Sequence, residues 1–188
     1  LYAYQNVMFS LFDPVIQAKT QKNFQQVMKE KVFEPFGMKN ASLDFESFES
    51  STNKAFPHQQ TEKSYKVLKL NNRYYSTAPA AGINASISDM GQFLLAISGD
   101  DDDLFPAEAR KITFTPQIES PLKRSYYRNW GALGTKHYAL GWRIVNFKNH
   151  TISHHSGFVS GYQSEIAVCS DYETGIAVLT NSPNSLFS

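Results

Sequence analysis

The sequence has a single cysteine, almost no excess of charge of either sign, and no apolar run that approaches the length of a membrane span. Cys169 has no partner for a disulfide within the chain, and its place in an apolar pattern predicts a small buried residue and not a reactive thiol. The 18 basic and 17 acidic side chains leave a net charge of +1, so nothing favours nucleic acid or an anionic membrane as partner. Membrane anchoring is expected only through a segment that precedes residue 1.

Patterns typical of metal sites are also missing. Four consecutive carboxylates, Asp100 to Asp103, lack the spaced donors and the turn glycine of a calcium loop. A zinc hypothesis rests on His150, His154, His155 and Cys169. Alternation along a strand places His154 and His155 on opposite faces, which leaves no tetrahedral set. The basic and aromatic stretch from Lys123 to Trp130 is more typical of a packed loop than of a nucleic-acid site. We therefore expect no metal and no other cofactor.

Helical patterns occupy the first part of the chain and its middle. They are predicted over Asn6 to Ala18, Phe24 to Phe33, Ile87 to Ile97 and Pro106 to Ile112. Ser86 or Ser88 caps the third helix, and Gly99 ends it. Between residues 39 and 78 the chain is polar and irregular, with short strand-like pieces near Ser42 to Phe45 and Tyr65 to Leu68. We expect this segment to be a surface excursion that walls a cleft.

The last part of the chain predicts strands. They cover Ala139 to Phe147, Thr151 to His155, Gln163 to Cys169 and Gly175 to Asn181, with turns at Lys148 and at Asp171 to Glu173. Short turns predict antiparallel neighbours, and the apolar run Ile176 to Leu179 predicts burial on both faces under covering helices. The interpretation is one α+β domain over 1–188, mainly helical at 1–38 and 79–115, with the excursion at 39–78 and an antiparallel sheet at 138–181.

Two short motifs at opposite ends of the chain carry polar groups suited to acyl transfer. Tyr4-Gln5-Asn6 offers a phenol and an amide, and His155-Ser156-Gly157 places an imidazole beside small residues at the end of a strand. Each of these two residues, taken alone, has a purely structural explanation. Tyr4 is also typical of a half-buried side chain at the start of a helix, and Asn6 is also typical of a helix cap. The parity of His155 with Ser153 indicates that the imidazole need not lie in the core. Such an imidazole changes its charge near neutral pH.

With further short matches in the same order, these motifs resemble the serine β-lactamase and penicillin-binding-protein superfamily. The resemblance is to the branch of class C β-lactamases, D-alanyl-D-alanine carboxypeptidases and related esterases. The further matches are Val32 to Met38, Ala80 to Ser86 with Asp89 and Met90, Tyr138 to Trp142, and Gly175 to Asn181. Histidine in the third motif, in place of lysine, favours a carboxypeptidase or esterase relative over a typical class C β-lactamase.

The resemblance implies a serine hydrolase or acyl-transferase that cleaves a small-molecule or peptide amide or ester through an acyl-enzyme. In that scheme Tyr4 accepts the proton of the serine, His155 polarises the Tyr4 hydroxyl, and Asn6 binds the acyl part of the substrate. Ser156 and Gly157 let the substrate lie along the strand edge, where the N–H of Phe158 faces the oxyanion. The resemblance also implies a periplasmic or cell-envelope location.

The nucleophile that the resemblance requires is a Ser-x-x-Lys upstream of Tyr4, and the chain begins only three residues before Tyr4. Two such strings occur downstream, Ser51 to Lys54 and Ser120 to Lys123, as often as chance predicts. We therefore expect an incomplete β-lactamase/transpeptidase-like domain that lacks its nucleophile segment and does not turn over alone. The alternative is a non-catalytic homologue whose cleft binds a peptide, a cell-wall fragment or a partner protein.

Overall fold

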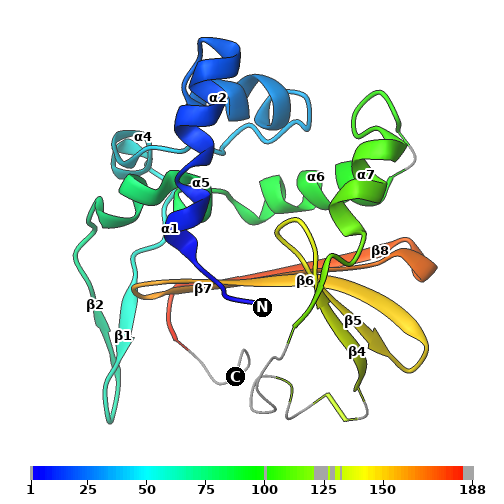
Figure 1. Ribbon diagram of the computed structural model, residues 1–188. Coiled ribbons are helices and arrows are strands. Elements are labelled where there is room, and N and C mark those ends of the chain that lie inside the picture. Colours follow the sequence, from blue (N-terminus) through cyan, green and yellow to red (C-terminus); the bar gives the residue numbers. More distant parts are fainter. Residues whose placement is uncertain (1, 100, 121–126, 128–129, 132, 184–188) are drawn as a thin grey trace.

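The computed structural model describes residues 2–99, 101–120, 127, 130–131 and 133–183. Its centre is a six-stranded antiparallel sheet in which the strands follow one another in chain order, with the helices gathered on one side (Figure 1). The strands are β3 (Ile118–Glu119), β4 (Leu133–Tyr138), β5 (Arg143–Phe147), β6 (His150–Val159), β7 (Tyr162–Cys169) and β8 (Thr174–Thr180). The predicted combination of early helices with a late antiparallel sheet is confirmed.

The single strand predicted over Ala139 to Phe147 is wrong, because the chain reverses within it. Gly141 has a φ of +82°, a left-handed conformation that glycine adopts without strain. The N–H of Ala139 donates to the carbonyl oxygen of Trp142 over 2.8 Å and closes the turn between β4 and β5. Arg143 therefore becomes the first residue of β5 and pairs with His154 on β6.

Strand β6 is longer than the predicted Thr151 to His155, and its two neighbours cover different lengths of it. It pairs with β7 from Ile152 to Val159, but its register with β5 ends at His154. The edge of β6 from His155 to Val159 therefore extends beyond β5.

The helices differ from prediction mainly at the start of the chain. They are α1 (Asn6–Phe9), α2 (Phe12–Thr20), α3 (Phe24–Met28) with a π-helical turn at Lys29–Phe33, α4 (Phe45–Ser50), α5 (Ala78–Ala81) after a 3₁₀ turn at Arg73–Thr77, α6 (Ile87–Ser98) and α7 (Ala107–Phe114). The predicted helix Asn6 to Ala18 is broken at Ser10. Pro14 has no N–H to continue a helix, and the break places it in the first turn of α2, where none is needed.

Helix α6 matches its prediction and covers the sheet. Ser86 caps it and forms a capping box with Asp89, whose buried carboxylate also accepts the N–H of Asn40 over 3.1 Å. Leu94 and Ile97 face the core. Contact with β8 is close, because a Cβ at Gly175 would lie 2.7 Å from Leu94 Cδ2. None of the described helices has both the length and the apolar composition needed to cross a membrane.

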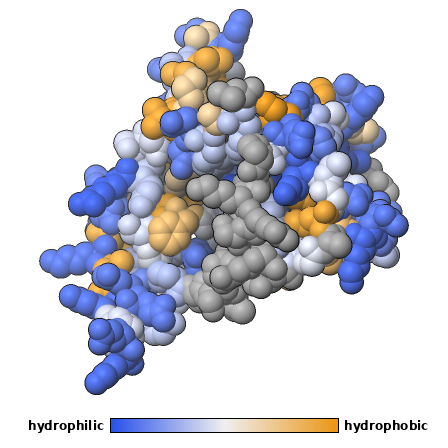
Figure 2. Space-filling model, turned by 60° about the horizontal axis from the view of Figure 1, so that its bottom comes forward, coloured by the Kyte–Doolittle hydropathy of each residue, from blue (hydrophilic) through white to orange (hydrophobic). Residues whose placement is uncertain are grey.

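The expectation that Ile176 to Leu179 is buried on both faces is wrong. Helix α6 covers the face of β8 that Gly175 presents, and the alternation of the strand directs Ile176 to the other face. Ile176 is 59% exposed and Leu179 is 38% exposed. Cys169, expected to be buried, is a free thiol of intermediate exposure. Apolar side chains also gather at the top of the molecule, over α2 (Figure 2).

The 39–78 excursion is more regular than its sequence indicates. Asp44 accepts the N–H of Ser47 over 2.6 Å and caps α4, so only Ser42 of the strand predicted near Ser42 to Phe45 pairs, in a bridge with Asn84. The second predicted piece is confirmed as β2 (Tyr65–Val67), which pairs with β1 (His58–Gln60). The N–H of His58 donates to the carbonyl oxygen of Asn181 over 2.9 Å and joins this hairpin to the end of β8.

Candidate active site

Tyr4 and His155, from opposite ends of the chain, meet at the extended edge of β6. Tyr4 lies on the segment that leads into α1, and His155 is on β6 just past the end of β5. Their ring centroids are 6.0 Å apart, and the ring planes are inclined by only 28°. Tyr4 is 43% exposed, so the phenol borders solvent. The predicted proximity of the two rings is therefore present.

The residues that follow His155 present backbone groups to this edge. Val159 and Tyr162 pair across a two-residue turn. Hydrogen-bonded and non-hydrogen-bonded pairs alternate along antiparallel strands, so the N–H of the preceding residue, Phe158, points away from β7. A Cβ at Gly157 would meet Oγ of Ser164, so a larger residue here would require that hydroxyl to rotate away. The Phe158 N–H thus points to the side of β6 that β5 leaves unpaired.

Asn6 follows Tyr4 by two residues and is exposed. It is the first residue of α1, and the capping position belongs to Gln5, so the cap role that its sequence also allowed does not apply. Within the described residues the Asn6 side chain makes no hydrogen bond. Its amide is available to a ligand.

The imidazole of His155 bonds to a different tyrosine from the one we expected. Its Nδ1 donates to the carbonyl oxygen of Ser156 over 2.7 Å, and its Nε2 accepts from the Tyr138 hydroxyl over 3.1 Å. Burial, with a smaller contribution from the charge of Arg143, lowers the pKa of His155 to about 4. The expectation of a charge change near neutral pH is therefore wrong, and the ring is neutral at pH 7.

Arg143 is a part of this site that sequence reasoning missed. It is 9% exposed, and its guanidinium carbon lies 5.6 Å from the centroid of the Tyr4 ring. Its Nη1 donates to Oγ of Ser156 over 3.4 Å. Arg143 on β5 pairs with His154 on β6, next to His155. Recognition of the turn at Gly141 would have given this β5–β6 register and so placed Arg143 at the site.

Two further tyrosines complete the surroundings of Tyr4. Burial raises the pKa of Tyr138 to about 12, and burial also raises the pKa of Tyr4, against an opposing effect of Arg143. The Tyr2 and Tyr138 rings pack with centroids 5.5 Å apart. A pocket of about 290 Å³ opens here, lined by Tyr2, Ala3, Tyr4, Gln5, Met8, Phe9, Ile118 and Tyr138.

His154 has a structural environment on the other face of β6. It is 1% exposed, its Nδ1 lies 2.9 Å from a carboxylate oxygen of Glu165, and its Nε2 lies 3.0 Å from the Tyr127 hydroxyl. No cluster of metal-binding side chains occurs in the part of the chain that the structure describes. Of the basic and aromatic stretch, Tyr127 and Trp130 are described, whereas Lys123, Arg124, Tyr126 and Arg128 lie outside the described residues, as does Asp100.

In the first downstream Ser-x-x-Lys string, the side chains of Ser51 and Lys54 each bond to backbone carbonyl oxygens and not to each other. Lys54 donates to the backbone carbonyl oxygens of Glu49 and Ser51 over 2.7 and 2.6 Å, while the Ser51 hydroxyl donates to the carbonyl oxygen of Asn53. Ser120 is buried, and Lys123 lies outside the described residues.

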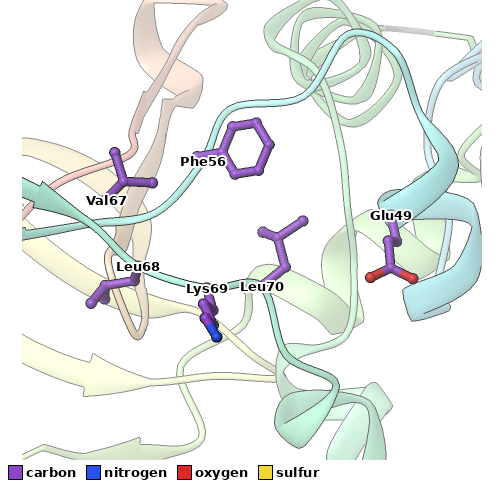
Figure 3. Close-up of a pocket in the computed structure, with 6 residues that line it drawn as sticks. All are labelled: Glu49, Phe56, Val67, Leu68, Lys69 and Leu70. Carbon is purple, nitrogen blue, oxygen red and sulfur yellow. The ribbon is translucent and has the colours of Figure 1, made fainter.

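A larger pocket, of about 460 Å³, lies in the excursion and contains none of the predicted site residues (Figure 3). Its lining consists of Glu49, Phe56, Val67, Leu68, Lys69 and Leu70. Both α4 and the β1–β2 hairpin contribute to its wall. The excursion thus forms a cavity of its own.

Comparison with known proteins agrees with the overall fold. The Beta-lactamase family model matches residues 1–188, and the chain belongs to this family. Its fold resembles those of solved penicillin-binding proteins and class C β-lactamases. The octameric penicillin-binding protein homologue from Pyrococcus abyssi superimposes with a TM-score of 0.83 at 23% identity, over 97% of this chain and 39% of that one.

Two hydrolases are also similar. The unguisins hydrolase ungD' of Aspergillus campestris (strain IBT 28561) is 23% identical over all of this chain and 34% of its own length. The D-stereospecific amidohydrolase from Streptomyces sp. superimposes with a TM-score of 0.71 at 16% identity, over 96% of this chain and 50% of that one. The chain therefore spans about a third to a half of the length of these relatives and has a hydrolase-type fold.

Proposed function

We propose that this chain forms part of a serine hydrolase or acyl-transferase that cleaves an amide or ester through a covalent acyl-enzyme. The observation that carries the proposal is the stacking of the Tyr4 phenol on His155, 6.0 Å between centroids, at the uncovered edge of β6. A proton carrier, an imidazole and an outward backbone N–H at one solvent-bordered edge are the groups that acyl transfer needs. Membership of the Beta-lactamase family supports the same chemistry.

The proposed roles follow from the positions of the groups. With Tyr4 as the phenolate, the serine oxygen bonds to the substrate carbonyl carbon as its proton passes to the Tyr4 oxygen, and the negative charge that forms on the carbonyl oxygen faces the N–H of Phe158. Tyr4 then gives the proton to the leaving nitrogen or oxygen as the tetrahedral species collapses. Water repeats the sequence and releases the acyl group. Asn6 binds the acyl side, and Ser156 and Gly157 border the substrate along β6.

We place the nucleophilic serine, with its lysine, in a segment of the whole protein outside residues 1–188. Lys54 is engaged by backbone carbonyls, and this chain covers only 34% and 50% of the length of the two hydrolases that it resembles. The chain by itself would then bind without turnover. The substrate class, small-molecule or peptide, agrees with relatives that are an amidohydrolase and a hydrolase of unguisins.

Covalent labelling of the whole protein tests the proposal. A fluorescent penicillin and a fluorophosphonate should each leave an adduct, and peptide mapping by mass spectrometry should locate it on a serine outside residues 1–188. A heat-denatured sample controls for nonspecific reaction. Absence of any adduct on folded protein, or an adduct on Ser51 or Ser120, would contradict the proposal.

A non-catalytic binding protein is the second candidate, and the raised pKa of Tyr4 favours it, because a base must lose its proton near neutral pH. In that case a peptide or cell-wall fragment should bind at equilibrium, for example by calorimetry, and stay intact over hours. Turnover of the same ligand would exclude this candidate.

A further inference from the structure

The proposed role of Tyr4 requires a positive charge nearby. A free tyrosine has a pKa of about 10, so about one molecule in a thousand is ionised at pH 7. Burial in this site makes ionisation harder. A cation close to the ring is what lowers the free energy of the phenolate relative to the phenol.

The imidazole of His155 does not provide that charge. Its Nδ1 donates to the Ser156 carbonyl and its Nε2 accepts from Tyr138, which is the hydrogen-bond pattern of a neutral ring. Nor does Lys54, whose ammonium bonds to two carbonyl oxygens in the excursion and lies over the ring of Phe56.

Arg143 is the described cation that contacts Tyr4. Its guanidinium lies over the Tyr4 ring, at a distance typical of a cation–π pair, and the same group bonds to Ser156 in the motif on β6. It is fixed at the first position of β5 and is almost fully buried, so its charge is poorly screened by water and salt.

We infer that Arg143 is the positioning residue of this site: its guanidinium stabilises the Tyr4 phenolate during acyl transfer. The role in transfer rests on the proposed function, whereas the electrostatic effect on Tyr4 does not. An arginine keeps its charge throughout the accessible pH range, so the stabilisation is present at every pH at which the protein is folded.

Other groups also face Tyr4, and the test has to separate them. Tyr2 lies on the same segment, Tyr138 on β4 and His155 on β6. Burial keeps His155 neutral at pH 7 and raises the pKa of Tyr138, and a negative charge on Tyr2 or Tyr138 would oppose ionisation of Tyr4. Arg143 therefore acts in the opposite direction to its neighbours.

The test compares Arg143→Gln, Arg143→Lys and a matched control in the whole protein. Arg110→Gln is the control, because Arg110 also lies over an aromatic ring, 6.0 Å from the Phe105 centroid, but belongs to α7. Circular dichroism and thermal unfolding select variants that keep the fold. The ionisation of Tyr4 is followed by NMR of ¹³Cζ-labelled tyrosine, with Tyr4→Phe to assign the signal.

We expect the Tyr4 titration midpoint to move to higher pH in Arg143→Gln, to move less in Arg143→Lys, and to stay in place in Arg110→Gln. Acylation by fluorescent penicillin at pH 7 should slow by about 10- to 100-fold in Arg143→Gln, the range for loss of a unit charge roughly 6 Å from an anion at an effective dielectric near 20. The rate should fall less in Arg143→Lys.

An unchanged Tyr4 midpoint in folded Arg143→Gln overturns the inference, whatever the rates are. If the midpoint moves but the unsubstituted whole protein forms no adduct, the electrostatic effect of Arg143 stands and the proposed hydrolase function fails. If the midpoint moves and acylation is unaffected, Arg143 has no part in the transfer step.

Discussion

Tyr4 stacks on His155 with 6.0 Å between ring centroids, and the Tyr138 hydroxyl, not that of Tyr4, donates to the imidazole. The pair therefore consists of a phenol whose oxygen is not bonded to its stacked neighbour and an imidazole whose two nitrogens are both engaged. This arrangement leaves the Tyr4 oxygen to a substrate or nucleophile. Its consequences can be measured.

Removal of the Tyr4 hydroxyl should slow acylation of the whole protein by fluorescent penicillin about 10²- to 10⁴-fold, the usual range for loss of a proton-transfer group. Tyr4→Phe keeps the ring, so the stacking on His155 and the fold should persist. Tyr65→Phe, on the exposed part of the β1–β2 hairpin, is the matched control and should react normally. A folded Tyr4→Phe variant with an unchanged rate would remove Tyr4 from its proposed role.

The low pKa of His155 should make stability depend on pH. The folded state holds the imidazole neutral down to a pKa of about 4, whereas the unfolded chain takes up the proton near pH 6.5. The unfolded state therefore binds more protons between these values. The free energy of unfolding should fall as the pH falls from 6.5 to 4, by up to about 3 kcal/mol from this residue.

Urea denaturation at several pH values measures this loss. In His155→Gln, the free energy of unfolding should depend less steeply on pH between 6.5 and 4, by the amount that corresponds to about one bound proton. In His137→Gln, which also removes one imidazole, the steeper slope should persist. Equal slopes in wild type and His155→Gln would show that His155 is not held neutral by the fold.

His154 should matter for stability and not for the site. His154→Phe keeps an aromatic ring but removes the partner of both Glu165 and the Tyr127 hydroxyl. Because these groups are buried or half-buried, we expect a loss of about 2 to 4 kcal/mol in the free energy of unfolding. Glu165→Gln, which retains a hydrogen-bonding group, should lose less. Chemical denaturation of both variants measures these losses. A His154→Phe variant as stable as the wild type would contradict the structural role of His154.

Two glycines should respond to alanine in opposite directions. Gly161 has a φ of +80°, and a Cβ there would lie 2.6 Å from Pro57 Cβ and 2.8 Å from the backbone nitrogen of His58. Gly161→Ala should therefore cost about 1 to 3 kcal/mol. Gly91 is exposed on α6 with open space around it, so Gly91→Ala should stabilise by about 0.5 to 1 kcal/mol. Thermal unfolding should show the two shifts with opposite signs.

Local patterns were sufficient for some elements. The Ser86 cap and the helical spacing of Leu94 and Ile97 predicted α6, because capping and amphipathic periodicity are written within a dozen residues. The resemblance of the terminal motifs predicted that Tyr4 and His155 meet.

The turn before β5 and the burial of the site residues were not predicted from the sequence. The turn at Gly141 was missed because Tyr138 to Trp142 looks like a continuous apolar strand, and with the turn the register that brings Arg143 to the site was also missed. The neutral state of His155 depends on burial, which a sequence pattern does not report. Exposure of Ile176 depends on which side of the sheet the helices cover.

The hydrogen bonds that attach the β1–β2 hairpin to the rest of the protein have a practical consequence. Its base is held by Leu68 N–H to the Pro57 carbonyl and by His58 N–H to the Asn181 carbonyl, whereas its tip, Thr61 to Ser64, is exposed and bonded only within itself as far as the structure describes. A reporter peptide or a fluorophore grafted at the tip would therefore project from the body of the protein without loosening its attachment to the sheet.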